Sequence, residues 1–217
     1  MKGRWIKAGI PALLAVVLVA GGVFAVSTKV SEKTIAIPLP EHIKKVENLQ
    51  FELKDGYVKN GTVYLKTRDA SEIQPTAILV DAFIDIFPDK YSYNVNDYGT
   101  VNIHVKTYAN PFGFASYFLK IPNGVTYINV YDGPQPSNVF YLDSGECQPI
   151  PNYGLVCGPA TVLYWGVVHS WNYEKFIKVK VKYTSSGSFA MFSHVTEEQI
   201  PLGVKAQDSD SFSVTVN

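Results

Sequence analysis

Apolar and polar residues alternate along most of residues 49–217, which is the two-residue period of β-strands. In residues 100–108 valine and isoleucine alternate with polar residues, and in residues 176–183 they alternate mainly with lysines. Residues 76–87 are apolar enough for a strand that is buried on both faces. The same pattern predicts further short strands at 49–53, 57–59, 62–66, 114–121, 125–131, 139–142, 162–168, 188–193 and 212–216.

Gly, Pro, Asn or Asp lies between most of these strands, and we find no amphipathic helix between them. A parallel βαβ architecture is therefore disfavoured. The pattern predicts an all-β domain over residues 49–217, an immunoglobulin-like or jelly-roll-type antiparallel β-sandwich. Asn60-Gly61 predicts a type I′ hairpin turn. The Pro- and Gly-bearing segment 132–137 is expected to be a loop or a boundary between two β units.

Residues 1–26 combine a basic head with an uncharged apolar stretch that is expected to form one helix before the sandwich. At about 1.5 Å per residue, the stretch 8–26 is at the lower edge of the length that spans a bilayer. Three interpretations stay open: a signal peptide cleaved after Ala25, an uncleaved transmembrane anchor, and a pilin-type signal cut near residues 7–9. All three place the rest of the chain outside the cytoplasm, either secreted or anchored by a single membrane pass.

Residues 27–48 are predicted to be an extended polar connector. Pro38 and Pro40 confine the segment 34–40 to a sheet edge or to a free extended piece, because proline cannot donate to a ladder of hydrogen bonds. Residues 41–48 are expected to form a short helical turn.

Composition narrows the function classes. Apolar residues make up 47% of the chain and charged residues 18%, enough apolar content to build a core. The net charge is zero, which argues against a nucleic-acid partner, because such proteins need a basic stripe to displace counterions from phosphates. Aromatic residues reach 13% and add to the β character.

Cys147 and Cys157 are ten residues apart and enclose a Pro- and Gly-rich loop. Outside the cytoplasm such a pair is expected to form a disulfide. Free thiols and a metal site are the alternatives, although the spacing lacks the close cysteine pairing of zinc sites. Asn60-Gly61-Thr62 is a candidate glycosylation site, and the turn chemistry of Asn-Gly explains the same residues without a glycan.

No catalytic, cofactor-binding or metal-ligating residues are predicted. The sequence lacks Gly-x-Ser-x-Gly, His-Glu-x-x-His and a Gly-rich phosphate loop. Two pairs of acidic residues and one group of tyrosines are candidate sites: a carboxylate pair on one strand face, an acidic turn that could hold calcium weakly, and a carbohydrate platform. Plain sheet-edge or packing roles compete with each. The residues are Asp81 with Asp85, Asp208 with Asp210, and Tyr91 with Tyr93 and Tyr98. The histidines, expected on the surface or in loops, are His42, His104, His169 and His194.

Two resemblances add to this picture. The stretch 21–29, with Gly21-Gly22 and Phe24-Ala25, resembles the signal end of TasA-type biofilm fibre subunits, which implies a mature N-terminus that donates a strand to the next subunit. The stretch from 121–125 through Trp165-Gly166 to Gly187 is similar to immunoglobulin-like repeats of prokaryotic, archaeal-type cell-surface proteins. That resemblance implies a sandwich used for display or assembly, without chemistry.

The sequence thus predicts a non-catalytic, exported cell-surface structural protein that is displayed or assembled into a filament, surface layer or adhesion. Its expected partners are other copies of the chain or other surface proteins, the membrane if the helix is kept, and carbohydrate as a further candidate. Two alternatives are a membrane-anchored accessory or ligand-binding subunit and a pilin-like subunit. A hydrolase with a site assembled from distant residues is a third.

Overall fold

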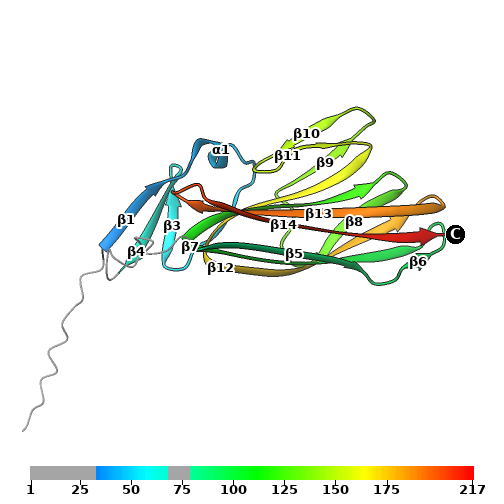
Figure 1. The fold of residues 1–217 in the computed structure, drawn as a ribbon, viewed down its shortest axis with the longest axis horizontal. Helices are drawn as coiled ribbons and strands as arrows, with labels where there is room; N and C mark the ends of the chain where they lie inside the picture. Colours follow the sequence, from blue (N-terminus) through cyan, green and yellow to red (C-terminus); the bar gives the residue numbers. More distant parts are fainter. Residues whose placement is uncertain (1–32, 68–78) are drawn as a thin grey trace, which may run out of the picture. The chain divides into compact units, whose positions relative to one another are not determined.

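Two long antiparallel strands, β7 (Tyr98–Pro122) and β12 (Ala160–Tyr183), form the centre of the fold in this computed structural model (Figure 1). The structure describes residues 33–67 and 79–217, all within one compact unit. Pairing of the two strands runs from one end of each to the other. The sequence predicted two short strands in place of each, and this was wrong. The Pro, Gly and polar residues that suggested loops lie inside continuous strands.

Both long strands turn a corner near their middle. The register between them shifts at Ser170 and Trp171, and Trp171 has a positive φ of 56°. Asn110 and Pro111, joined by a cis peptide bond, lie at the same place in β7. A bulge of this kind bends a strand and lets it pass from one sheet layer to the other. The two layers of the sandwich are therefore built from halves of the same two strands.

Each layer adds outer strands to these halves. The first layer contains the first half of β7 and the second half of β12; its outer strands are β5 (Val80–Pro88) and β8 (Val125–Asp132). The second layer contains the remaining halves; its outer strands are β9 (Asn138–Leu142), β13 (Gly187–Ile200) and β14 (Lys205–Val216). Two short strands pair in parallel with β12 and β14; they are β2 (Gln50–Glu52) and β6 (Ser92–Tyr93).

This arrangement confirms an all-β, sandwich-like fold. The apolar helix predicted before it lies in residues 1–26, outside the described residues. In the ranges 33–67 and 79–217 there is no helix of the length and apolar character needed to span a bilayer. The segment 132–137 joins β8 to β9, and both of these strands pair with β12.

The main core lies between the two layers. It is formed by alternate residues of the central strands, among them the apolar residues Val101, Ile103 and Val105 of the alternating segment 100–108. Tyr117 stacks on Trp165 at its centre, with ring centroids 5.2 Å apart. The prediction that the strand at 76–87 is buried on both faces was wrong for β5, because only one side of that strand meets this core.

Residues 33–67 cover part of the outer side of the second layer. They form a three-stranded sheet in the order β1 (Lys33–Pro38), β4 (Thr62–Thr67), β3 (Gly56–Lys59), with one helical turn, α1 (Glu41–Lys44). Ile43 of that turn is fully buried against Phe112 and Phe114 of β7. Asn60 and Gly61 have φ of 52° and 67°, as the predicted type I′ turn requires.

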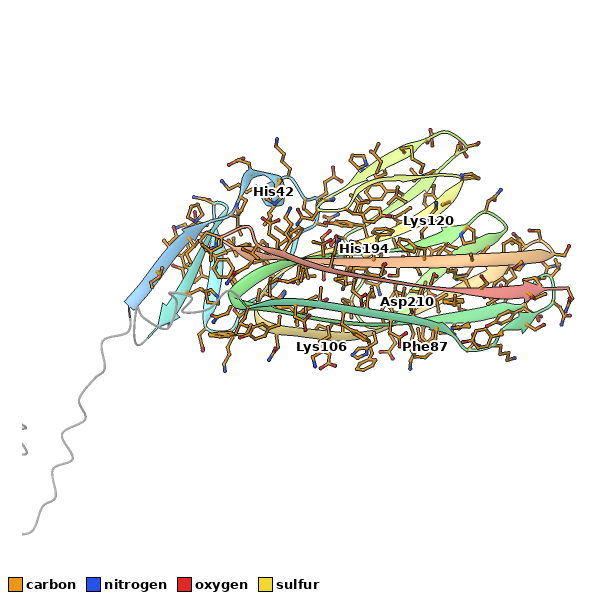
Figure 2. All side chains as sticks on the ribbon, in the orientation of Figure 1. His42, Phe87, Lys106, Lys120, His194 and Asp210 are labelled. Carbon is orange, nitrogen blue, oxygen red and sulfur yellow. A yellow bond between two sulfur atoms is a disulfide. The ribbon has the colours of Figure 1, made fainter. Side chains whose placement is uncertain are left out.

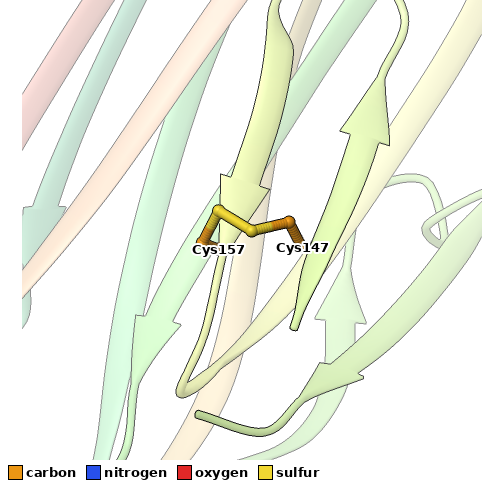
Figure 3. Close-up of a disulfide and its surroundings, with 2 residues drawn as sticks. All are labelled: Cys147 and Cys157. Atoms are coloured by element: carbon orange, nitrogen blue, oxygen red, sulfur yellow. A yellow bond between two sulfur atoms is a disulfide. The ribbon is translucent and has the colours of Figure 1, made fainter. Parts of the chain in front are cut away.

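A disulfide-linked hairpin packs on the same outer side. Its strands are β10 (Cys147–Ile150) and β11 (Gly154–Cys157). Ile150 and Val156 are buried in a small apolar cluster with Phe118 and Tyr164 of the sheet. Cys147 and Cys157 stand directly opposite each other and are joined by the predicted disulfide (Figure 3).

Side chains of β14 close the gap between the two layers along β5. The backbone N–H of Ile84 donates to Asp208 Oδ2 at 3.0 Å, and that of Ile86 donates to Asp210 Oδ2 at 2.9 Å. We call this contact the aspartate seam; Asp210 is labelled in Figure 2. The predicted acidic turn at Asp208 and Asp210 was wrong, because both residues lie within β14 and their carboxylates replace a backbone ladder.

Candidate functional site

The outer face of the first layer presents aromatic rings and lysines to solvent. Strand alternation places these side chains there, because their neighbours in β5, β7 and β12 point into the core. Figure 2 shows Phe87 and Lys106 on this side of the sandwich. We call this surface the aromatic–lysine face; its members are Phe83, Phe87, Tyr98, His104, Lys106, Tyr131, Phe176, Lys178, Lys180 and Lys182.

A ring cluster lies in the middle of the face. The imidazole of His104 stacks on Phe176 with centroids 4.1 Å apart, and Phe83 meets the same imidazole edge-on at 5.5 Å. His104 Nε2 is 2.9 Å from Glu174 Oε1. Cross-strand pairs of this kind stabilise a sheet. The exposed position predicted for His104 agrees with its place on this face.

An open hollow lies where the face reaches the start of β7. It has a volume of about 350 Å³, and Tyr98, Thr100, Asn129, Tyr131 and Lys180 are among its lining residues. The hydroxyls of Thr100 and Tyr131 are 3.1 Å apart. The ammonium of Lys180 sits 4.7 Å from the ring centroid of Tyr98, a cation–π distance. We call this the tyrosine hollow.

Asp89 fixes the wall of the tyrosine hollow. Its Oδ1 accepts hydrogen bonds from the Tyr93 hydroxyl at 2.7 Å and from the Thr100 N–H at 2.6 Å. Burial, and then the hydrogen bond to Asp89, raise the pKa of the Tyr93 hydroxyl. Tyr93 is itself buried and stacks on Tyr183 with centroids 4.2 Å apart. The wall is therefore held by hydrogen bonds between the exposed Asp89 carboxylate, the buried Tyr93 and the backbone of β7.

The tyrosines predicted as a carbohydrate platform do not share one surface. Tyr98 lies in the tyrosine hollow, Tyr93 is buried, and Tyr91 is exposed after β5. Sequence reasoning missed Tyr131 and Lys180, which strand register brings to the same place. The only signal for Lys180 was the lysine alternation in residues 176–183.

Inside the corner of the sandwich lies a buried ionisable pair. His169 Nε2 is 3.0 Å from Glu197 Oε2 and 3.0 Å from the Thr107 hydroxyl. The two side chains are 1% and 0% exposed, so neither can reach a substrate in solvent. Gly113 leaves room for them, because a Cβ there would lie 1.8 Å from Glu197 Oε1. The prediction that His169 is a surface or loop residue was wrong.

A second buried carboxylate ties several elements together. Glu198 Oε2 lies 2.9 Å from His42 Nε2, accepts a hydrogen bond from Asn152 at 2.7 Å, and is 3.7 Å from the ammonium of Lys205. These partners come from α1, the disulfide-linked hairpin and the start of β14. His42 is exposed as predicted. The Glu198 carboxylate therefore joins α1, the hairpin and β14 to β13, and these contacts do not form a site that is open to a ligand.

His194 also departs from its predicted surface position. It is buried in β13, with Nε2 3.0 Å from the Thr196 hydroxyl. Burial lowers the pKa of the His194 imidazole, and the Asp208 carboxylate opposes that shift.

The remaining candidate residues are placed as follows. Asp81 and Asp85 lie on the outer side of β5; Asp81 Oδ1 accepts a hydrogen bond from the Ala82 N–H at 3.0 Å. Burial, and then hydrogen bonding with Asp210 and its charge, raise the pKa of Asp85. The described ranges contain no cluster of three His, Cys, Asp or Glu side chains able to hold a metal ion. Asn60 is exposed in its turn, and its glycosylation stays a prediction. Cleavage after Ala25 lies outside the described residues.

No family model matches the sequence, and no curated protein is similar to it in sequence. Solved structures with a distant likeness include the CARDB domain of the PF1109 protein from Pyrococcus furiosus, solved with di-metal ions (15% identity, 64% of this chain, 89% of that chain, TM-score 0.34). Another is a non-cellulosomal cohesin from Archaeoglobus fulgidus (14% identity, 62% of this chain, 91% of that chain, TM-score 0.35). A third is the structure of domains D2 and D3 of the major pilin SpaD from Corynebacterium diphtheriae (12% identity, 61% of this chain, 51% of that chain, TM-score 0.37).

Proposed function

We propose that this chain is a non-catalytic, exported cell-surface protein whose sandwich is displayed or assembled outside the cytoplasm. The observation that carries the proposal is the Cys147–Cys157 disulfide. Disulfides persist in oxidising compartments and are rare in the cytosol, where thiols are kept reduced. The basic and apolar residues 1–26 support the same location, since they have the composition of a targeting or anchoring segment.

The position of the disulfide strengthens this reasoning. Both cysteines are exposed, at the open end of a hairpin that lies on the outside of the second layer. An exposed disulfide is open to attack by reducing thiols, because exchange depends on access to the sulfur atoms. Its presence therefore favours a compartment without a reducing thiol pool.

A structural role is supported by what the ionisable groups do. Glu198 joins three elements to β13, Asp208 and Asp210 close the seam to β5, and Glu197 is buried against His169. These carboxylates accept hydrogen bonds or pair within the fold. Exposed aromatic side chains gather on the opposite side of the sandwich, as is common for surfaces that meet a partner.

The test is to locate the protein in its own cells. The full chain, tagged after Asn217, is probed on intact cells with an impermeant protease and, after mild reduction, with an impermeant thiol reagent. We expect cleavage and labelling of Cys147 and Cys157 without lysis. A chain lacking residues 1–26 is the matched control and should stay inside with reduced thiols. Protection of the full chain, with thiols already reduced in the cell, would refute the proposal.

The same preparation separates the three interpretations of the N-terminus. Intact mass and N-terminal sequencing of the mature protein report where the chain begins. A start at Val26 supports secretion, a start at Ala8 or Gly9 supports a pilin-like subunit, and an intact Met1 supports an anchored subunit. Sedimentation of the gently extracted protein then tests assembly, since a monomer without a surface partner would count against it.

A further inference from the structure

We propose that the tyrosine hollow binds an acidic sugar, a uronic acid unit of an extracellular polysaccharide. This deepens the proposed function and rests on it, because an exported chain meets such polymers. The proposal comes from three properties of the hollow: its shape, its half-exposed rings, and the cations beside them.

The shape of the hollow follows from strand register. Thr100, Lys180 and Asn129 are direct neighbours across β7, β12 and β8, and they form one row on the outer face. Tyr98 and Tyr131 are the aromatic side chains of the lining. The volume of about 350 Å³ is at the lower end of the range of roughly 300–1,000 Å³ typical of small-molecule pockets. An open hollow of this size suits one or two units of a chain that continues past it.

The rings suit the face of a sugar. Tyr98 is 55% exposed and Tyr131 is 51% exposed, whereas Tyr93 and Tyr183 of the same region are buried in the core. The C–H groups on one face of a pyranose carry a small positive charge, and an aromatic face carries the negative part of its quadrupole. Hydroxyl and amide groups of Thr100 and Asn129 lie in the same hollow and can exchange hydrogen bonds with sugar hydroxyls.

The cations specify an acidic ligand. The ammonium groups of Lys180 and Lys182 lie 4.7 and 5.8 Å from the ring centroid of Tyr98. Lys178, two residues before Lys180 in β12, is paired with Asp132 at 3.1 Å, whereas Lys180 and Lys182 form no ion pair within the described ranges. A carboxylate placed beside Tyr98 would accept charge-assisted hydrogen bonds from them, which are stronger than bonds between neutral groups.

The carboxylate of Asp89 does not cancel this preference. It lines the hollow, and its Oδ1 already accepts hydrogen bonds from the Tyr93 hydroxyl and the Thr100 N–H. Lys180 in the lining and Lys182 beside Tyr98 bring two ammonium groups to the region of this one carboxylate. A neutral sugar would stack on the rings but would leave both ammonium groups without an anionic partner.

The experiment measures binding to the full chain, purified in mild detergent because of its apolar N-terminal stretch. Calorimetry compares an oligogalacturonate with a neutral galactose oligomer of the same length. We expect the acidic oligomer to bind at least tenfold more tightly, and this difference should shrink as salt screens the lysines. Tyr98→Ala should weaken binding about five- to tenfold through the lost ring contact. Lys180→Gln should weaken it about tenfold.

Matched control variants lie away from the hollow. Tyr141→Ala removes an exposed tyrosine of β9, and Lys59→Gln removes an exposed lysine beside the 60–61 turn. Both should bind the acidic oligomer within twofold of the unchanged chain. Urea midpoints equal to that of the unchanged chain show that the hollow variants are folded, since both altered side chains are exposed.

Three results would overturn the proposal: equal affinity for the neutral oligomer, unchanged binding by Tyr98→Ala and Lys180→Gln, or polyglutamate binding as tight as oligogalacturonate. The last would show a general patch of positive charge. Failure of the proposed function is distinguishable, because it is measured by location in cells. A purified chain that binds acidic sugar through the hollow but resides in the cytoplasm would refute the proposed function alone.

Discussion

Removing the aspartate seam should destabilise the sandwich by an amount that the structure sets. Asp208 and Asp210 each accept one backbone N–H from β5, at 3.0 and 2.9 Å. A hydrogen bond to a charged group contributes about 1.5–3 kcal/mol. The seam is half-buried, and losing Asp210 relieves its repulsion with Asp85. We therefore expect Asp208→Ala with Asp210→Ala to lower the free energy of unfolding by about 2–4 kcal/mol.

A second pair of substitutions separates the contribution of the hydrogen-bond acceptor from the contribution of its charge. Asp208→Asn with Asp210→Asn keeps a carbonyl oxygen in each position and should cost about half as much, because a neutral hydrogen bond contributes about 1 kcal/mol. Ser209→Ala with Ser211→Ala is the matched control, since these residues are exposed on the other side of β14. It should change stability by less than about 0.5 kcal/mol.

The seam also predicts a pH dependence. Burial, and then Asp210, raise the folded-state pKa of Asp85 above its ordinary value. The folded state therefore holds this proton more tightly, so the contribution of Asp85 to stability is largest near pH 4 and falls as pH rises through the raised pKa. Asp210→Asn should lower the pKa of Asp85 and flatten this part of the profile.

The assay is urea unfolding followed by tryptophan fluorescence between pH 4 and 8, with hydrogen exchange of the amides of Ile84 and Ile86. Exchange of these two amides should quicken in the alanine variant before other amides of the sheet do. The reasoning would be refuted if the alanine and serine-control variants unfolded at the same urea concentration and both amides kept their protection.

Further predictions concern other contacts. Replacing Cys147 and Cys157 by alanine should cost about 2–3 kcal/mol, because the closed loop is short; urea unfolding of oxidised and reduced protein gives the same comparison without mutation. Glu198→Ala should cost about 2–3 kcal/mol in urea unfolding, and Glu198→Gln distinctly less, because the amide oxygen can still accept. Gly113→Ala should cost at least about 2 kcal/mol, since its Cβ would overlap the Glu197 carboxylate; an unchanged thermal midpoint would contradict this contact.

Alternation predicted those strands that have one face on the core and one in solvent. Residues 100–108 and 125–131 are of this kind, and both appear in the fold. It could not show that 100–108 and 114–121 are one strand. The residues between them include Pro111 and Gly113, which locally indicate a turn. The strand continues past them because Gly113 pairs with both β12 and β13, and this pairing is tertiary information.

Buried polar residues were the other feature that the sequence pattern could not predict. The predicted strand at 188–193 stopped before a polar run that includes Glu197, Glu198 and Gln199, yet these three residues are buried within β13. Their partners come from β12, β7, α1 and the hairpin, far apart in the sequence. The tyrosine hollow was predicted only in part. Tyr98 was a candidate from the sequence, but its neighbours in the hollow come from other strands and are placed by strand register.

The sharing of β7 and β12 between both layers has a consequence for how quickly the chain reaches its native state. The sequence separation of their paired residues is smallest for Pro122 with Ala160 and largest for Tyr98 with Lys182. Zipping outward from the near pair would join the central strands of the second layer first and those of the first layer after the corner. Because both layers share these two strands, we expect them to be completed in one cooperative step. Such high contact order implies refolding on the order of milliseconds to seconds. Stopped-flow fluorescence of Trp165, which lies between the layers, should report both layers in a single phase.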